Sequence, residues 1–228
     1  MRPHDPAANS AAAPAADAAR GAVRLAAIAL SLAALAAYAN SFAGVFVLDD
    51  LAAIPNNESL RDLTRVLAPP ADSTTFGRPI ANLSFAIDRA WNGDGPWGYH
   101  ATNLLIHLLA ALTLFGLVRR TLSLPRLAER FGADALPLAL AAAALWMLHP
   151  LQTESVTYVV QRVESLAGLL CLATLYAFVR GVESASPARW FGAAVLACLL
   201  AMGSKESAAA APLLVLLYDR TLVAGSFR

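Results

Sequence analysis

Long apolar runs separated by shorter polar segments dominate the chain from residue 22 onwards. A run of roughly 20 apolar residues is long enough for a helix that crosses about 30 Å of membrane hydrocarbon. The apolar runs occupy residues 23–38, 102–118, 136–148, 163–179, 190–203 and 207–218. The last two are short, so they need flanking residues or form a shallower helical hairpin around residues 204–206. We therefore expect an all-α fold, a polytopic membrane bundle of about six transmembrane helices over residues 22–222.

The two ends of the chain differ from this pattern. Residues 1–21 are rich in Ala, Pro and Asp without periodicity, which predicts a disordered cytoplasmic tail. Residues 223–228 are expected to form a truncated or cytoplasmic end. A cleaved signal peptide is the alternative for residues 23–38, because Ala37-Tyr38-Ala39 resembles a small-x-small cleavage site. The later apolar runs predict a membrane protein in either case.

Composition supports the membrane class. Of the 228 residues, 58% are hydrophobic and 14% are charged, which argues against an ordinary water-soluble domain. The net charge of +1 gives no reason to expect a nucleic-acid partner. A single lysine among 17 basic residues, together with abundant alanine, indicates GC-rich coding and a bacterial source. The two cysteines lie within apolar runs, so neither a disulfide framework nor a zinc-binding spacing is present.

Basic residues in short loops favour the cytoplasmic side of a membrane. With the N-terminus in the cytoplasm, eleven of the 17 basic residues fall inside and six outside. This split predicts a multi-pass protein of the bacterial inner membrane with both ends in the cytoplasm. The outer side then collects ten of the sixteen acidic residues.

Three polar clusters fall on that outer side. The first is Asp49-Asp50, beyond the first expected span. Adjacent carboxylates near a low-dielectric boundary repel each other, so one is expected to have a raised pKa while the other stays charged. Such a pair suits a general base or a metal ligand, and the alternative is a solvated turn.

The second cluster lies between the third and fourth expected spans. It contains His149, Glu154, Gln161, Arg162 and Glu164. Together with Tyr158, the residues Glu154, Gln161 and Arg162 are spaced by three or four positions, so they share one face if the segment is helical. Arg162 suits a phosphate, because a guanidinium binds phosphate oxygens bidentately and keeps its charge in a partly dry site. The alternative is a capping network in which Glu154 or Glu164 neutralises Arg162.

The third cluster is Ser204-Lys205-Glu206, between the last two expected spans. Lys205 could provide a second contact to an anion. The alternative is a lysine that extends toward the membrane interface and pairs with its neighbour.

The outer loop over residues 45–97 is too long for a plain turn and is expected to carry structure. Within residues 78–91, Ile80, Leu83, Ile87 and Trp91 lie along one side of a helix. This spacing predicts a helix that lies on the membrane surface.

A polar stripe follows in the second expected span, where His100, Asn103 and His107 recur at intervals of three and four. The stripe predicts hydrogen bonds between helices. Metal binding, catalysis and the substrate path of a transporter or channel are the alternatives.

Five segments resemble, in order, the membrane half of the transmembrane-and-tetratricopeptide-repeat O-mannosyltransferases and their bacterial relatives. They are "NSFAGVFVLDDLAAI", "GRPIANLSFAID", "GPWGYHATNLLIHLL", "LHPLQTESVTYVVQRVESLAGLL" and "AMGSKESAAAAPLLVLLYDR". The resemblance covers roughly residues 38–220, and the block around "HPLQTESVTYVVQRVESLAGL" is its most specific part. It implies the N-terminal half of a GT-C fold, the all-helical class of membrane glycosyltransferases.

The resemblance also implies an activity. Enzymes of this class transfer a sugar, with mannose the candidate here, from a polyprenyl-phosphate carrier to a protein or glycan hydroxyl outside the cytoplasm. Asp49 corresponds to the leading acid of the family's first-loop motif, the proposed catalytic base, and Asp50 to its acidic partner. The other matching motif positions, expected to bind substrate, are His149, Glu154, Arg162, Glu164, Lys205 and Glu206. We assign Arg162 and Lys205 to stabilising the departing phosphate on the basis of their charge.

The chain also departs from the family pattern. Family members continue into more spans and then helical repeats of about 34 residues, whereas no such repeat is found here, which suggests a fragment. The resemblance does not imply a particular cofactor, and it leaves metal dependence open. A multi-pass transporter or channel and a non-catalytic membrane scaffold are the alternatives to an enzyme.

Overall fold

The computed structural model describes residues 6–62 and 64–226, with side chains from residue 17 onwards. Over these ranges the chain folds into helices joined by turns, and it contains no strand. The all-α fold expected from the apolar runs is confirmed.

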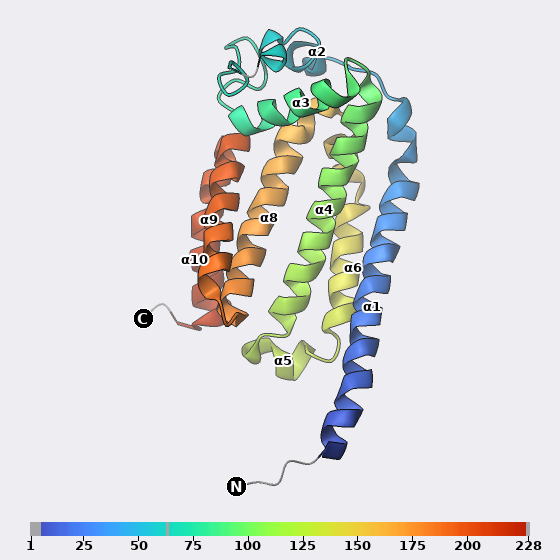
Figure 1. Ribbon diagram of the computed structural model, residues 1–228, viewed down its shortest axis with the longest axis vertical. Coiled ribbons are helices and arrows are strands. Elements are labelled where there is room, and N and C mark those ends of the chain that lie inside the picture. Colours follow the sequence, from blue (N-terminus) through green and yellow to red (C-terminus); the bar gives the residue numbers. More distant parts are fainter. Residues whose placement is uncertain (1–5, 63, 227–228) are drawn as a thin grey trace.

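Helices arranged side by side form the body of the described part (Figure 1). These are α1 (Pro6–Tyr38), α4 (Pro96–Leu122), α6 (Ala135–Met147), α8 (Arg162–Glu183), α9 (Pro187–Ser204) and α10 (Ala211–Tyr218). The connections from α1 to α4, from α6 to α8 and from α9 to α10 all lie at one end, the upper end in Figure 1. Three segments that are far apart in sequence therefore meet at that end.

Shorter elements form the connections. At the upper end they are α2 (Asp49–Ala53), α3 (Pro79–Asn92), α7 (Thr153–Thr157) and the 3₁₀ turns Ala39–Ala43, Glu58–Arg61, Pro150–Gln152, Val159–Gln161 and Glu206–Ala210. At the lower end lie α5 (Pro125–Phe131) and a π-helical turn, Asp219–Val223.

The number of spans is lower than the six expected. Among the described residues, four helical segments are long and apolar enough to cross a membrane: Asp17–Ala43, Pro96–Leu122, Val159–Glu183 and Pro187–Ser204. Helices α5 and α6 would add a fifth span if counted together, although they are bent by 93°. The eight residues of α10 cover only about 12 Å at 1.5 Å per residue, which is too short to count as a span.

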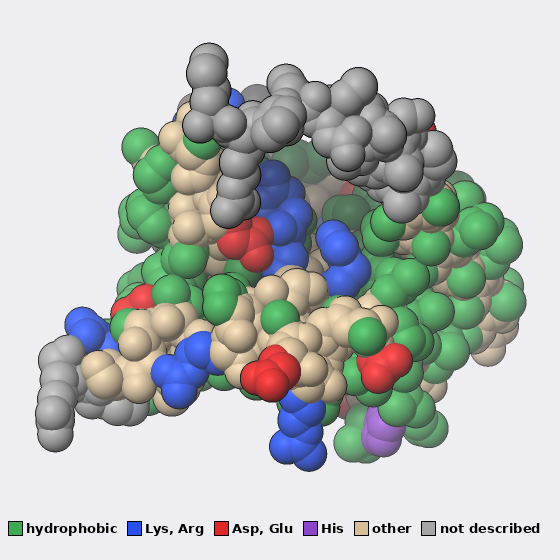
Figure 2. Space-filling view, turned by 90° about the horizontal axis from the view of Figure 1, so that it is seen from below, with side chains coloured by type: hydrophobic (Ala, Val, Ile, Leu, Met, Phe, Trp, Pro, Cys, Tyr) green, Lys and Arg blue, Asp and Glu red, His purple; other side chains and the backbone are tan. Residues whose placement is uncertain are grey.

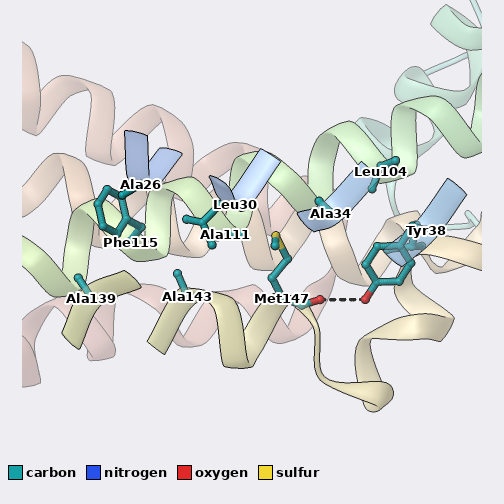
Figure 3. Close-up of a cluster of buried hydrophobic side chains, with 11 residues drawn as sticks. Ala26, Leu30, Ala34, Tyr38, Leu104, Ala111, Phe115, Ala139, Ala143 and Met147 are labelled. Atoms are coloured by element: carbon teal, nitrogen blue, oxygen red, sulfur yellow. Dashed lines mark hydrogen bonds between the residues drawn. The ribbon is translucent and has the colours of Figure 1, made fainter. Parts of the chain in front are cut away.

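The start of α1 also differs from the expectation. Residues 1–5 of the expected disordered tail lie outside the described residues, but α1 begins at Pro6 rather than near residue 22. The physical reason is the alanine content, because alanine has the highest helix propensity of all residues. Helix α1 is also packed into the bundle, since the Tyr38 hydroxyl donates a 2.8 Å hydrogen bond to the Met147 carbonyl (Figure 3).

Small side chains line the core between α1, α4 and α6 (Figure 3). Ala34, Ala111, Ala139 and Ala143 are fully buried there. Small residues at such contacts let helix backbones approach closely, which is the usual way in which membrane helices pack. A second close approach holds α3 onto the bundle, because a Cβ at Gly203 would lie 2.6 Å from the Cγ1 atom of Ile80.

The long connection between α1 and α4 is ordered by a buried polar network. The Asn82 side-chain oxygen accepts hydrogen bonds from Asn57 Nδ2 at 2.9 Å and from Thr75 Oγ1 at 2.8 Å. The Asn82 amide in turn donates to the carbonyl of Val66 at 2.8 Å. Satisfied buried networks of this kind fix a single arrangement of the backbone. Helix α3 is thereby held across the upper end of the bundle (Figure 1).

The apolar side predicted for the segment 78–91 is only partly packed in α3. Trp91 is 82% exposed and Ile87 is 43% exposed, whereas the buried residues of this helix include Ala81, Asn82 and Phe85. The exposed Ile87 and Trp91 leave an apolar surface beside the bundle. That α3 rests on a membrane stays a prediction.

Candidate functional site

A polar cavity of about 330 Å³ lies where the three upper connections meet. It is lined by Asp49, Thr74, Arg78, Val160, Gln161, Val163, Glu164 and Lys205. Asp49, Glu164 and Lys205 come one each from the three polar clusters of the sequence. The cavity therefore combines carboxylates with two cationic side chains.

The two neighbouring aspartates have different environments. Asp49, at the start of α2, is exposed and lines the cavity. Asp50 is fully buried, and its carboxylate accepts hydrogen bonds from the Val47 N–H at 3.0 Å and from the Val160 N–H at 2.7 Å. Burial raises the pKa of Asp50, and the two backbone hydrogen bonds partly oppose that rise. Asp49 is thus available to a bound molecule, whereas Asp50 ties two segments together.

The residue before this pair has an unusual backbone. Leu48 has φ of +47° and ψ of −117°, and no other non-glycine residue in the described ranges has positive φ. An L-residue in this region is strained, and such strain is often stored at functional sites. The side chain of Leu48 is 79% exposed, so its packing does not explain the strain. The hydrogen bonds of Asp50 to residues 47 and 160 hold the strained turn and thereby position Asp49.

Arg78 is a cavity residue that we did not select from the sequence. It lies at the N-terminus of α3, where Pro79 fixes the start of the helix. Its guanidinium contacts the Glu206 carboxylate at 3.1 and 3.3 Å and donates to the Thr74 carbonyl at 3.1 Å. The hydrogen bonds from Arg78 lower the pKa of Glu206. Arg78 belongs to the segment "GRPIANLSFAID", whose apolar spacing predicted a surface helix but gave the arginine no role.

Lys205 and Glu164 form a second ion pair in the same cavity. The pair joins the end of α9 to the first turn of α8, so Lys205 is not paired with its neighbour Glu206. Each cation of the cavity has one carboxylate partner, and a bound anion would compete with that partner.

Arg162 lies outside the cavity, fully buried in the bundle. Its guanidinium is 2.6 Å from the carboxylate of Asp88 and donates to the Asn103 side chain at 2.7 Å. It also donates to the carbonyls of Ser84 and Tyr99. Neutralisation by an acid is the alternative to phosphate binding that the sequence suggests for Arg162. The structure has such a network, although the acid is Asp88 and not Glu154 or Glu164. Arg162 thus joins α3, α4 and α8.

His149 and Glu154 do not line the polar cavity. The Nδ1 atom of His149 accepts a hydrogen bond from the Leu151 N–H at 3.2 Å and caps a 3₁₀ turn. The carboxylate of Glu154 accepts from the side-chain amide of Gln161 at 3.1 Å. Glu154 therefore reaches the cavity only through Gln161.

A second cavity of about 310 Å³ shares Glu164 with the first. It extends between α4, α6 and α8 past apolar residues such as Leu114, Trp146 and Leu172. Its polar residues include Gln152 and Ser155, close in sequence to Glu154. A polar compartment and an apolar compartment thus adjoin at Glu164.

The polar stripe of α4 makes contacts between helices. Asn103 donates to the Val159 carbonyl at 3.1 Å, and His107 Nε2 is 2.9 Å from the Met147 carbonyl oxygen. The ring nitrogens of His100 are buried and have no hydrogen-bond partner among the described residues. No group of three His, Cys, Asp or Glu side chains in the described ranges is placed to hold a metal ion.

These features define a polytopic α-helical membrane protein with a charged cavity at one end of its bundle. Comparison with curated proteins identifies its family. The chain is 31% identical over 199 residues to Protein O-mannosyl-transferase Tmtc2 of Drosophila melanogaster, which covers 80% of this chain and 20% of that protein. It is 34% identical over 197 residues to Tmtc1 of the same organism, covering 80% of this chain and 21% of that protein, and 32% identical over 166 residues to mouse TMTC1, covering 68% and 17%.

The chain belongs to the family of these TMTC proteins. It spans about one fifth of the length of the curated relatives it matches. No family model and no solved structure matches the chain.

Proposed function

We propose that this chain is part of a membrane glycosyltransferase that transfers mannose from a polyprenyl-phosphate carrier to a hydroxyl group of a protein or glycan. The observation that carries the proposal is the polar cavity, in which the exposed Asp49 lies with Arg78 and Lys205. The family relationship supports the sugar, because the relatives are named protein O-mannosyl-transferases.

In the proposed reaction, Asp49 accepts the proton of the acceptor hydroxyl as its oxygen attacks the anomeric carbon. The bond between that carbon and the phosphate oxygen breaks, and its electron pair leaves with the lipid phosphate. A single displacement inverts the configuration at the anomeric carbon. The negative charge that develops on the phosphate is stabilised by the two cations of the cavity.

The geometry favours Arg78 with Lys205 over Arg162 with Lys205 as the phosphate-binding pair. Arg162 already has an acid and three neutral acceptors, and it is fully buried outside the cavity. We assign Arg162 the role of fixing the start of α8, from which Glu164 reaches the cavity. Asp50 is likewise a positioning residue, because its two oxygens accept from backbone amides.

The adjoining apolar cavity supports a lipid-linked donor. It meets the polar cavity at Glu164 and runs along α4 and α8, so it offers space for the first isoprene units of the carrier. His149 and Glu154 are assigned to the rim around the two compartments. An acidic and a basic group at a membrane interface suit chemistry on a lipid headgroup better than passage of a solute through the bilayer.

The proposed location is the bacterial inner membrane, with the cavity on the non-cytoplasmic side. Basic residues gather at the opposite end of the bundle, among them Arg119, Arg120, Arg126 and Arg130 in and around α5. The preference of basic residues for the cytoplasmic side supports this orientation.

The proposal is tested with the full-length protein in proteoliposomes and undecaprenyl-phosphate mannose as the donor. Asp49→Asn is expected to lower sugar transfer by about 10² to 10⁴, because it removes the general base, while donor binding stays within about twofold. The matched control is Glu58→Gln, an exposed acid of the same loop that lies outside the cavity. Transfer by Asp49→Asn within about twofold of wild type would refute the assignment of Asp49. Failure of the wild-type protein to bind the donor would favour a transporter or a scaffold.

A further inference from the structure

A second charged cavity lies at the other end of the bundle. Its volume is about 440 Å³, and its basic residues are Arg20 and Arg24 of α1 and Arg119 of α4. Small and apolar residues complete it, among them Gly132 and Leu136 from the turn into α6. Figure 2 looks onto this end and shows basic side chains in a hollow between apolar surfaces.

Two of the three arginines lack a counter-charge. Arg20 pairs with Asp17, but Arg24 and Arg119 have no ion pair or side-chain hydrogen bond to any residue in the described part of the chain. The Nε atom of Arg119 is also buried, so neither a described side chain nor open solvent satisfies it. A buried guanidinium N–H without an acceptor is unfavourable. The lining contains no acid, so the cavity is electrostatically suited to an anion.

An apolar groove continues from this cavity along the outside of the bundle. The groove, of about 410 Å³, lies between α1 and α6 and shares Leu136 with the charged cavity. Its other residues include Leu25, Ala29 and Leu140, and none of its lining residues is charged. A basic compartment therefore adjoins an apolar one at Leu136.

We propose that this end of the bundle binds an anionic phospholipid. The headgroup phosphate lies between Arg24 and Arg119, and one acyl chain occupies the groove between α1 and α6. Arginine forks bind phosphate oxygens bidentately, and basic pockets between membrane helices are recurrent sites for acidic lipid headgroups. The apolar groove favours a lipid over a free phosphate, because it offers a site for an acyl chain, which a free phosphate lacks. The proposal is independent of the catalytic one, because the two charged cavities lie at opposite ends.

The test is lipid binding to the purified chain in neutral detergent, measured by native mass spectrometry. The probes are dioleoyl phosphatidylglycerol, dioleoyl phosphatidylcholine and the soluble sn-glycerol 1-phosphate. Wild type is expected to bind the phosphatidylglycerol about tenfold more tightly than the phosphatidylcholine, and Arg24→Gln with Arg119→Gln to abolish that preference. The matched control Arg130→Gln, an exposed arginine of α5 outside the cavity, is expected to change binding by less than about twofold.

A second arm tests the groove. Ala29→Trp is expected to weaken phosphatidylglycerol binding without affecting binding of the soluble phosphate, since it fills only the apolar part. Arg24→Gln alone, at an exposed position, provides a variant whose fold is retained if the double variant does not fold. Equal losses of phosphatidylglycerol binding in Arg24→Gln and Arg130→Gln would show that only the overall surface charge matters, and would overturn the proposal. Binding of sn-glycerol 1-phosphate as tight as that of the phospholipid would overturn it as well.

Discussion

The carboxylate of Asp50 accepts a 2.7 Å hydrogen bond from the backbone N–H of Val160, which lies 110 residues further along the chain. This contact joins the loop after α1 to the turn before α8, the two segments that contribute Asp49 and Gln161 to the polar cavity. The position of the exposed aspartate therefore depends on the buried one. The adjacent Asp49 and Asp50 have different roles, because α2 directs the Asp50 side chain inward and the Asp49 side chain into the cavity.

Asp50→Asn is expected to lower the stability of the protein. An amide can accept from only one of the two backbone N–H groups, and the other is left buried without an acceptor, at a cost of about 1–3 kcal/mol. Thermal unfolding in detergent measures the effect as a lower Tm. Asp49→Asn is the matched control, since its exposed side chain is expected to leave Tm unchanged. Equal Tm values for the two variants would contradict the structural role of Asp50.

The stability contributed by Asp50 is expected to depend on pH. Burial raises the pKa of Asp50, so the folded protein binds the proton more tightly than the unfolded chain, for which 3.8 is the ordinary value. Stability contributed by this group therefore increases as pH falls from neutral through the raised pKa toward 3.8. The difference in Tm between wild type and Asp50→Asn, which does not titrate here, should grow in favour of wild type over that interval. Parallel Tm curves for the two proteins would count against a raised pKa.

Leu48→Gly tests whether the strained backbone at residue 48 positions Asp49 at the expense of stability. Glycine adopts positive φ without the steric conflict of a Cβ atom, so the usual loss of about 1 kcal/mol for glycine in a regular element is offset at this position. We expect an unchanged or higher Tm together with lower sugar transfer, because Asp49 is then less firmly positioned.

The control for this variant is Leu51→Gly, a substitution in α2 at ordinary helical φ. It is expected to lower stability by about 1 kcal/mol, the typical penalty for glycine in a helix. If Leu48→Gly lowers Tm as much as Leu51→Gly does, the positive φ of Leu48 does not reduce the stability of the wild-type protein.

Arg162→Gln is expected to destabilise the bundle. Removing one partner of a buried ion pair leaves the charge of Asp88 without compensation, which typically costs about 3–5 kcal/mol. Asp88→Asn should have a similar effect, and the double variant should lose less than the sum of the two. Additive losses in Tm would show that the two residues act independently. A Tm unchanged in Arg162→Gln, with weaker donor binding, would instead restore the phosphate-binding role expected from the sequence.

The sequence predicted the all-α membrane class and the end of the bundle at which polar groups gather, because both follow from local patterns of apolar and charged residues. The number of spans was overestimated, since apolarity alone does not reveal that α10 is short and that α6 follows a 93° bend. The surroundings of Arg162 were misjudged for a different reason. Its partner Asp88 lies 74 residues earlier and belongs to a helix expected to rest on the membrane, so no local spacing connects the two. Arg78 and Lys205 likewise meet only after α3 is packed against α9 through Gly203.

The two cations of the polar cavity are expected to contribute separately to donor binding. Arg78→Gln and Lys205→Gln each remove one positive charge that faces the proposed phosphate. Charge-assisted hydrogen bonds contribute about 1.5–3 kcal/mol, so each variant should bind undecaprenyl-phosphate mannose about 10- to 100-fold more weakly. The measurement is a binding titration of the purified protein, and raising the salt concentration should weaken wild-type binding more than that of either variant. Arg61→Gln, an exposed arginine of the same loop that pairs with Glu58 outside the cavity, is the matched control.

Because Glu164 competes with the phosphate for Lys205, Glu164→Gln should strengthen binding in the Arg78→Gln background and leave it unchanged in the Lys205→Gln background. An equal effect of Glu164→Gln in both backgrounds would show that the phosphate does not contact Lys205.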